Sequence, residues 1–246
     1  MQGLTGQLPD IRTTVRAILE ACKLADDIPS LLPDADTNLP SLEEAFEQLV
    51  DIMARIESDA QAPGGARSED ITEIGDYALR LQETLSGVAE KQRLTAQKQP
   101  LADLSVNLAL WVAAHHGQLK TLEPVVDALA QLANTTQEPR QLEQLSSVIK
   151  RIIEAVAAPI SQDLEKMNPG RPWRLLLLNH GIIATRSHNT ALMGEAFSLL
   201  TSKLPEEATR FFSEGMQQME ALDYPPHVRE TMERYHREWP VKRSLH

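Results

Sequence analysis

Almost every segment of the chain repeats its apolar residues at steps of three or four, and the breaks between segments fall at proline, glycine and asparagine. This spacing gathers apolar side chains on one side of an α-helix, whereas a half-buried strand alternates them every second position. The most abundant residues include leucine, alanine, glutamate and glutamine, which are good helix formers. We therefore predict an all-α protein of nine or ten helices without a sheet, either a multi-helix bundle or an array of antiparallel helix pairs.

The predicted helices follow one another along the whole sequence. Proline is compatible with the first turn of a helix, and inside a helix it removes a hydrogen bond. We accordingly expect Pro159 to bend a long helix over 139–167. The other expected helices cover 9–24, the stretch between 41 and the break at 61–67, the stretch from 68 to at least 88, 101–116, 124–133, 172–188 and 189–203, with further helices starting at 205 and 225.

At 246 residues the chain is long enough for one large domain or two smaller ones. We expect an acidic N-terminal helical bundle over 1–98, a C-terminal array of helix pairs over 99–240 and a basic tail over 241–246. One continuous domain is the alternative. A shift of 67 residues relates "HHG" at 115–117 to "NHG" at 179–181, which leaves open an internal repeat of two three-helix units.

The composition excludes several classes of protein. With 35 acidic residues against 24 basic ones, the chain lacks the positive field that binds nucleic acid non-specifically. Cys22 is the only cysteine, so neither an intramolecular disulfide nor a cysteine zinc site can form within the chain. No apolar stretch approaches the length of a bilayer span, and no leader pattern is present, so we expect a cytoplasmic protein without membrane contact.

Sequence motifs for catalysis and cofactor binding are absent. The chain contains no G-x-G-x-x-G, no phosphate-binding P-loop, no G-x-S-x-G and no H-E-x-x-H. No two of its histidines lie three or four residues apart, which is the spacing that builds a metal site from histidines on one face of a helix. We therefore predict no cofactor, no metal and no catalytic residues, and we lean towards a protein that is not an enzyme.

One segment departs from the acidic character of the chain. Residues 166–190, "KMNPGRPWRLLLLNHGIIATRSHNT", contain four basic residues, two histidines and no acid. The leucines at 175–178 and the isoleucines that follow put apolar side chains on all sides of a helix, which indicates a buried central helix. Arg171 and Arg174 precede that helix or lie in its first turn, where the helix dipole disfavours positive charge, so they need carboxylates from elsewhere.

Two interpretations of this basic segment remain open. In the first, the arginines form ion pairs with the ten acids of residues 26–59. In the second, they line a binding site, since arginine and tryptophan are typical of interaction hot spots. The residues proposed for that site are Arg171, Trp173, Arg174, Asn179, His180, Arg186 and His188, with Trp111 as a possible further member.

The leading hypothesis is a non-enzymatic interaction or scaffold protein that binds an acidic or amphipathic segment of a partner protein. The alternative is a sensor or enzyme for an anionic small molecule, with a core site lined by arginine and histidine and with His180 as acid or base. A third expectation concerns self-association. Apolar residues from Ile71 to Val88 form a seam along one helix, which could bury against a second copy of the chain in a homodimer.

Overall fold

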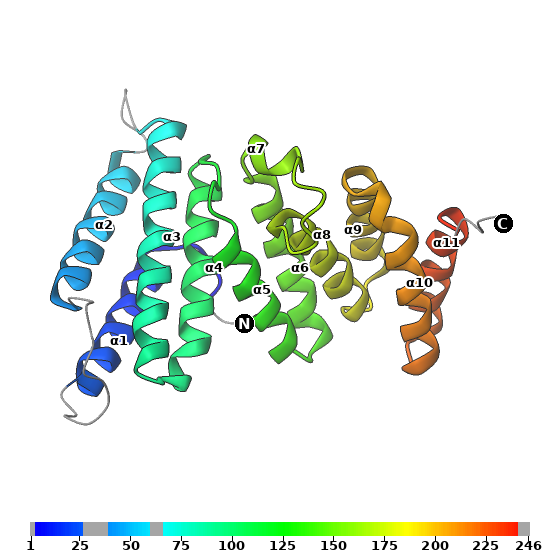
Figure 1. The fold of residues 1–246 in the computed structure, drawn as a ribbon, viewed down its shortest axis with the longest axis horizontal. Helices are drawn as coiled ribbons and strands as arrows, with labels where there is room; N and C mark the ends of the chain where they lie inside the picture. The colour runs from blue at the N-terminus through cyan, green and yellow to red at the C-terminus, as the bar shows by residue number, and fades with distance from the viewer. Residues whose placement is uncertain (1–2, 27–38, 60–65, 241–246) are drawn as a thin grey trace. The chain divides into compact units, whose positions relative to one another are not determined.

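The structure is a computed structural model that describes residues 3–26, 39–59 and 66–240 (Figure 1). Within these ranges the chain forms eleven α-helices, one short 3-10 helix and no strand. The all-α prediction is therefore confirmed, with slightly more helices than the nine or ten expected. None of the described helices combines the length and the apolar character needed to cross a lipid bilayer. The predicted basic tail at 241–246 lies outside the described residues.

The chain divides into two compact units. The N-terminal unit consists of residues 1–132 and 151–162, and the C-terminal unit consists of residues 133–150 and 163–246. Each unit thus consists of two segments of the chain that are not continuous in sequence. The domain boundary that we expect between residues 98 and 99 stays a prediction.

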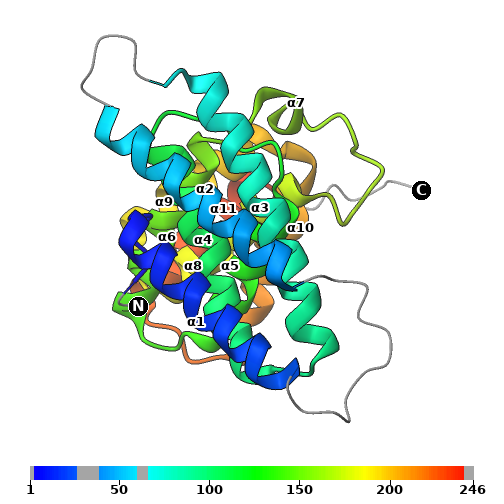
Figure 2. The same cartoon turned by 90° about the vertical axis from the view of Figure 1, so that its left-hand side faces the viewer.

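The N-terminal unit is built on four helices in two layers. These are α1 (Leu8–Asp26), α2 (Leu39–Asp59), α3 (Ser68–Lys91) and α4 (Lys98–Ala114), with the 3-10 helix η1 (Thr95–Gln97) between the last two. Helix α1 packs on α2 and α4, and α3 packs on α2 and α4. Figure 2 shows α1 and α2 as the front layer of this unit, with α3 and α4 behind them. Helix α5 (Glu123–Thr135) follows, and its residues up to Leu132 belong to the same unit.

Helix α4 is the buried element of this unit, because apolar residues surround it and all but one of its positions from Leu101 to Val112 are buried. Gly75 of α3 faces Val112 so closely that a Cβ atom at this position would overlap the valine side chain. The predicted seam of α3 is buried here as well, with Ile71, Leu85 and Val88 at most 8% exposed. The homodimer that we expect through this helix remains a prediction.

The C-terminal unit is built from successive helices that pair side by side (Figure 1). These are α8 (Pro172–Arg186), α9 (Thr190–Lys203), α10 (Pro205–Ala221) and α11 (Pro226–Glu238), together with the part of α6 (Pro139–Glu154) up to Lys150. Helix α8 packs on α9, and α10 and α11 pack on each other and on α9. Phe197, Phe212 and Tyr235 meet in the core with ring centroids 5.1 to 5.4 Å apart. Such aromatic contacts add to the stabilisation that burial alone provides.

The single long helix predicted over 139–167 is wrong. Helix α6 ends at Glu154, and the separate short helix α7 (Ala158–Ser161) starts next to Pro159, which occupies its first turn. Pro159 thus lies in the first turn of a new helix and does not bend a long one, because its ring and missing amide fit the start of a helix better than its interior. The sequence motifs of the possible repeat also differ in place, since "HHG" follows α4 whereas "NHG" lies inside α8. The structure therefore does not support a repeat based on them.

Asn189 caps α9 as the sequence predicted. Its Oδ1 accepts hydrogen bonds from the backbone N–H groups of Ala191 and Leu192, at 3.1 and 3.3 Å. We expect Asn189→Ala to lower the free energy of unfolding by about 1 kcal/mol, the usual cost of losing such a cap. Urea denaturation would measure it, and Asn189→Ser, which keeps an oxygen at the cap, should recover most of the loss. Equal losses in both variants would contradict the capping role.

Candidate functional site

The segment before α8 forms an ordered loop, residues 163–171, which we call the Arg171 loop. The turn sequence Asn168-Pro169-Gly170 reverses the chain, and the Asn168 side chain accepts a hydrogen bond from the Gly170 N–H at 2.9 Å. Pro172 then starts α8, where its missing amide is not needed. Asp163, at the other end of the loop, has a left-handed backbone conformation with φ of 53°. Asn and Asp tolerate this conformation better than most residues.

The side chain of Arg171 closes this loop from inside. Its Nε and Nη2 donate to the two carboxylate oxygens of Asp163, and both side chains are only 5% exposed. Its Nη1 donates to the backbone carbonyls of Lys166 and Asn168, each at 3.2 Å. A further bond runs from Nη2 to Glu206 of α10 at 3.3 Å. Bidentate pairing of this kind fixes geometry as well as charge, so one guanidinium fixes both ends and the middle of the loop.

Arg174 ties the same loop to α10. Its Nε and Nη2 donate to the carboxylate of Glu207, and its Nη1 donates to the carbonyl of Pro169 at 2.9 Å. The hydrogen bonds from Arg174 lower the pKa of Glu207, because they stabilise the charged carboxylate. Arg171 likewise has a raised pKa, chiefly through its hydrogen bonds to Asp163.

The carboxylates on these two arginines are Asp163, Glu206 and Glu207. All three belong to the C-terminal unit, as the arginines do. The expectation that these groups find negative partners is therefore met within one unit. The expectation that the partners are acids of residues 26–59 is wrong, since Asp163 of the loop and Glu206 and Glu207 at the start of α10 supply the carboxylates instead.

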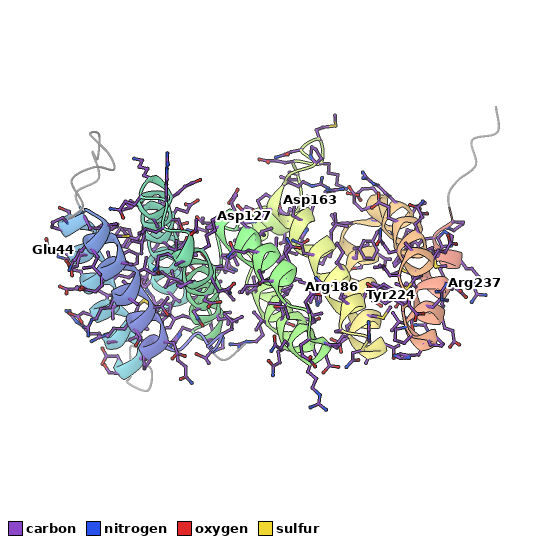
Figure 3. The ribbon with its side chains drawn as sticks, turned by 90° about the horizontal axis from the view of Figure 1, so that it is seen from below. Glu44, Asp127, Asp163, Arg186, Tyr224 and Arg237 are labelled. Atoms are coloured by element: carbon purple, nitrogen blue, oxygen red, sulfur yellow. The ribbon has the colours of Figure 1, made fainter. Side chains whose placement is uncertain are left out.

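Two apolar side chains of the Arg171 loop point into solvent. Leu164 is 80% exposed and Met167 is 96% exposed, the highest values among the large apolar residues of the described chain. Figure 3 shows the loop around the labelled Asp163 projecting from the body of its unit. The backbone is thus held in one conformation while its two apolar side chains remain uncovered.

Arg186 has a different role, at the far end of α8. Its Nη1 and Nη2 donate to the carbonyls of Ala133 and Thr136, both at 2.7 Å, at the C-terminal end of α5. Positive charge is favoured there, because the last carbonyls of a helix lack partners within it. His188 follows in a left-handed conformation with φ of 60°, and its ring meets the edge of Tyr224. Figure 3 labels Arg186 and Tyr224 near each other.

Trp173 and His180 lie two helical turns apart on the buried face of α8, and each is 3% exposed. His180 Nε2 bonds with the Ser146 hydroxyl at 3.2 Å, whereas its Nδ1 and the Trp173 Nε1 have no partner among the described residues. Burial lowers the pKa of His180 to about 4, because desolvation disfavours the imidazolium. The neighbouring Asn179 is only half-buried. The His180 ring is therefore a neutral, buried group of the C-terminal unit.

Trp111 belongs to the N-terminal unit and is 1% exposed on α4. Its Nε1 donates to Glu57 of α2 at 3.1 Å, and its ring lies 4.5 Å from that of His115. These contacts make it a core residue that joins α4 to α2.

Of the eight residues proposed from the sequence, Arg171 and Arg174 thus meet around the Arg171 loop, and Trp173 lies between them in sequence and is buried.

Sequence reasoning did not single out Leu164, Met167 or Asp163. The turn Asn168-Pro169-Gly170 was a signal for a loop, and nothing local indicated that Asp163 would be buried beneath it.

Among the residues that the structure describes, no group of three histidine, cysteine, aspartate or glutamate side chains is placed to hold a metal ion. Comparison of the chain with protein-family models, with curated proteins and with solved structures found no match.

Proposed function

We propose that the chain is a non-enzymatic interaction protein, and that its C-terminal unit binds an amphipathic segment of a partner protein through the Arg171 loop. The observation that carries this proposal is the display of Leu164 and Met167 on a backbone fixed by Arg171. A preorganised loop loses little conformational entropy when it binds, so more of the burial energy becomes affinity.

The free energy gained by burying these two side chains supports a specific interaction. Complete burial of a leucine or methionine side chain contributes about 1.5–3 kcal/mol. Methionine also adapts its unbranched, polarizable side chain to irregular partner surfaces. Two such anchors three residues apart on one loop suit the apolar face of a helix or a similar amphipathic segment.

The surrounding charges favour an amphipathic segment over a strongly acidic one. The guanidinium groups of Arg171 and Arg174 already hold carboxylates, so an acidic partner would have to displace them. Glu165 and Lys166, the charged residues on the exposed side of the loop, have opposite signs. The alternative function, a site for an anionic small molecule, has less support for the same reason.

We expect a photo-crosslinking amino acid in place of Met167 to trap one discrete protein adduct in cells of the source organism. The matched control carries the same group in place of Leu222, which is 52% exposed in the same unit. Mass spectrometry of the adduct identifies the partner. The absence of an adduct at 167, or the same set of adducts at both positions, would contradict the proposal.

Removal of the second anchor should weaken the same adduct. In the chain that carries the crosslinker at 167, Leu164→Ser is expected to reduce affinity for the identified partner by about tenfold or more, since losing one buried leucine costs about 1.5–3 kcal/mol. Leu24→Ser, at a residue that is 68% exposed on α1, serves as the control and should leave the affinity unchanged. An equal effect of both substitutions would show that the adduct results from non-specific apolar association.

A further inference from the structure

The N-terminal unit contains an open groove of about 760 Å³ between the end of α3, η1, the start of α4 and α5. Small-molecule sites in proteins commonly have volumes of about 300–1,000 Å³. All of the residues that line the groove lie between Gln82 and Gln131, so the groove belongs to one unit. It is remote in sequence from the Arg171 loop, and the inference drawn from it does not depend on the function proposed above.

Most of the buried side chains that line the groove are small, and we call them its floor. They are Ala89, Ala102, Ser105 and Ala128, beside the larger Leu101 and Gln82, and Gly87 of α3 also lines the groove. A Cβ atom at Gly87 would meet no other atom within 4 Å, whereas one at Gly75 of the same helix would overlap Val112. Packing therefore requires the glycine at 75 and not the one at 87. A glycine inside a helix costs about 1 kcal/mol relative to alanine, and the one at 87 lines the groove.

Gln82 supplies a hydrogen-bond acceptor that has no donor. Its side chain is 3% exposed, and its Nε2 donates to the Ser86 hydroxyl at 2.9 Å and to the Leu101 carbonyl at 3.3 Å. A carbonyl can only accept, so the Leu101 contact fixes which end of the amide carries the nitrogen. The Oε1 is buried and finds no partner among the described residues. An acceptor without a donor costs free energy, and a hydrogen bond from a ligand N–H would remove that cost.

The rim of the groove is acidic. Its exposed charged side chains are Glu83, Glu90, Glu123 and Asp127 against Arg93 and Lys98. Among the described residues, none of these six takes part in an ion pair. The excess of carboxylates attracts cations and repels anions, and a cation that binds them has no ion pair to break.

We propose that this groove binds a linear aliphatic oligoamine, a small molecule with ammonium groups joined by methylene chains. Its methylene groups pack on the alanine floor, one N–H donates to the Oε1 of Gln82, and its ammonium groups pair with the rim carboxylates. The three features of the groove thus match the three chemical features of one ligand class. A neutral apolar ligand would leave the rim uncompensated, and an anion would be repelled by it.

Isothermal titration with spermidine at 0.15 M salt tests the proposal. We expect saturable binding of one molecule per chain, and binding at least tenfold weaker for butylamine, which has a single ammonium group. Gly87→Phe adds an aromatic side chain to the lining of the groove, at a position where a Cβ atom meets no other atom within 4 Å, and should weaken spermidine binding at least tenfold. The matched control is Gly194→Phe on α9 of the other unit, where a Cβ atom also meets nothing within 4 Å. It should bind as the unaltered chain does.

A second pair of variants separates the groove from the general negative charge of the chain. Glu90→Gln with Asp127→Asn neutralises two rim carboxylates and should weaken spermidine binding at least tenfold. Glu154→Gln with Glu230→Gln removes the same charge from exposed positions outside the groove and should change it less than twofold. Absence of saturable binding, or equal losses in the two double variants, would overturn the proposal.

Discussion

Replacing Arg171 with methionine is expected to lower the free energy of unfolding of the C-terminal unit by about 3–5 kcal/mol, the cost of breaking a buried ion pair from one side. The substitution leaves the Asp163 carboxylate, which is 5% exposed, without a counterion, and it removes the donors to the carbonyls of Lys166 and Asn168. Urea denaturation followed by circular dichroism measures the loss.

Two further variants identify the source of this effect. Arg210→Met removes an ion pair with Glu214 whose side chains are 71% and 58% exposed, and exposed pairs of this kind contribute at most about 1 kcal/mol. Arg171→Met combined with Asp163→Asn removes the stranded charge and should recover part of the stability, because asparagine is neutral and tolerates the left-handed backbone at 163. A loss below about 1 kcal/mol for Arg171→Met alone would show that the pair does not hold the loop, since exposed pairs already account for that much.

Acidification from pH 6.5 to pH 4 is expected to cost the fold about 3 kcal/mol through His180 alone, at about 1.4 kcal/mol for each pH unit. The folded protein keeps this histidine neutral down to a pKa of about 4, because the ring is buried, whereas the unfolded chain takes up the proton near its ordinary pKa of 6.5. Above pH 6.5 the protonation of His180 therefore costs the fold nothing. The free energy of unfolding falls as the pH drops from 6.5 towards 4, and His180 changes it no further below that value.

The measurement is the free energy of unfolding in urea at several pH values between 7 and 4. His180→Gln removes the titrating group and keeps a side-chain amide near the Ser146 hydroxyl, so its stability should vary less with pH than that of the unaltered chain. His116→Asn, at an exposed left-handed position that asparagine tolerates, should leave the pH dependence unchanged. A parallel pH dependence for His180→Gln and the unaltered chain would show that His180 is not responsible.

Local signals in the sequence predicted most of the helices. The leucine-rich segment after Trp173 forms the helix that its apolar residues indicated, and Asn189 caps the next one at the expected position. These features depend on residues within one or two helical turns, which the sequence shows directly. The wrong prediction at Pro159 also concerns a local signal, because one proline is compatible either with a bend inside a helix or with the first turn of a new helix.

The candidate site was predictable only in part, for a reason of distance along the chain. The excess of positive charge in 166–190 indicated that Arg171 and Arg174 need carboxylates. Their partners Glu206 and Glu207 lie 35 and 33 residues away, and the packing of α10 brings them there. Asp163 is only eight residues from Arg171, yet its burial depends on how the whole loop closes.

The sequence by itself determined that the chain is helical, where most helices begin and end, and that the basic segment must find negative charge. The tertiary structure alone decided which carboxylates meet the arginines, that Leu164 and Met167 stay uncovered, and that small residues of three elements leave a groove beside Gln82. Helix formation depends on neighbours within a few residues, whereas exposure and ion pairing depend on which helices pack together, and periodicity within one helix does not specify its partner.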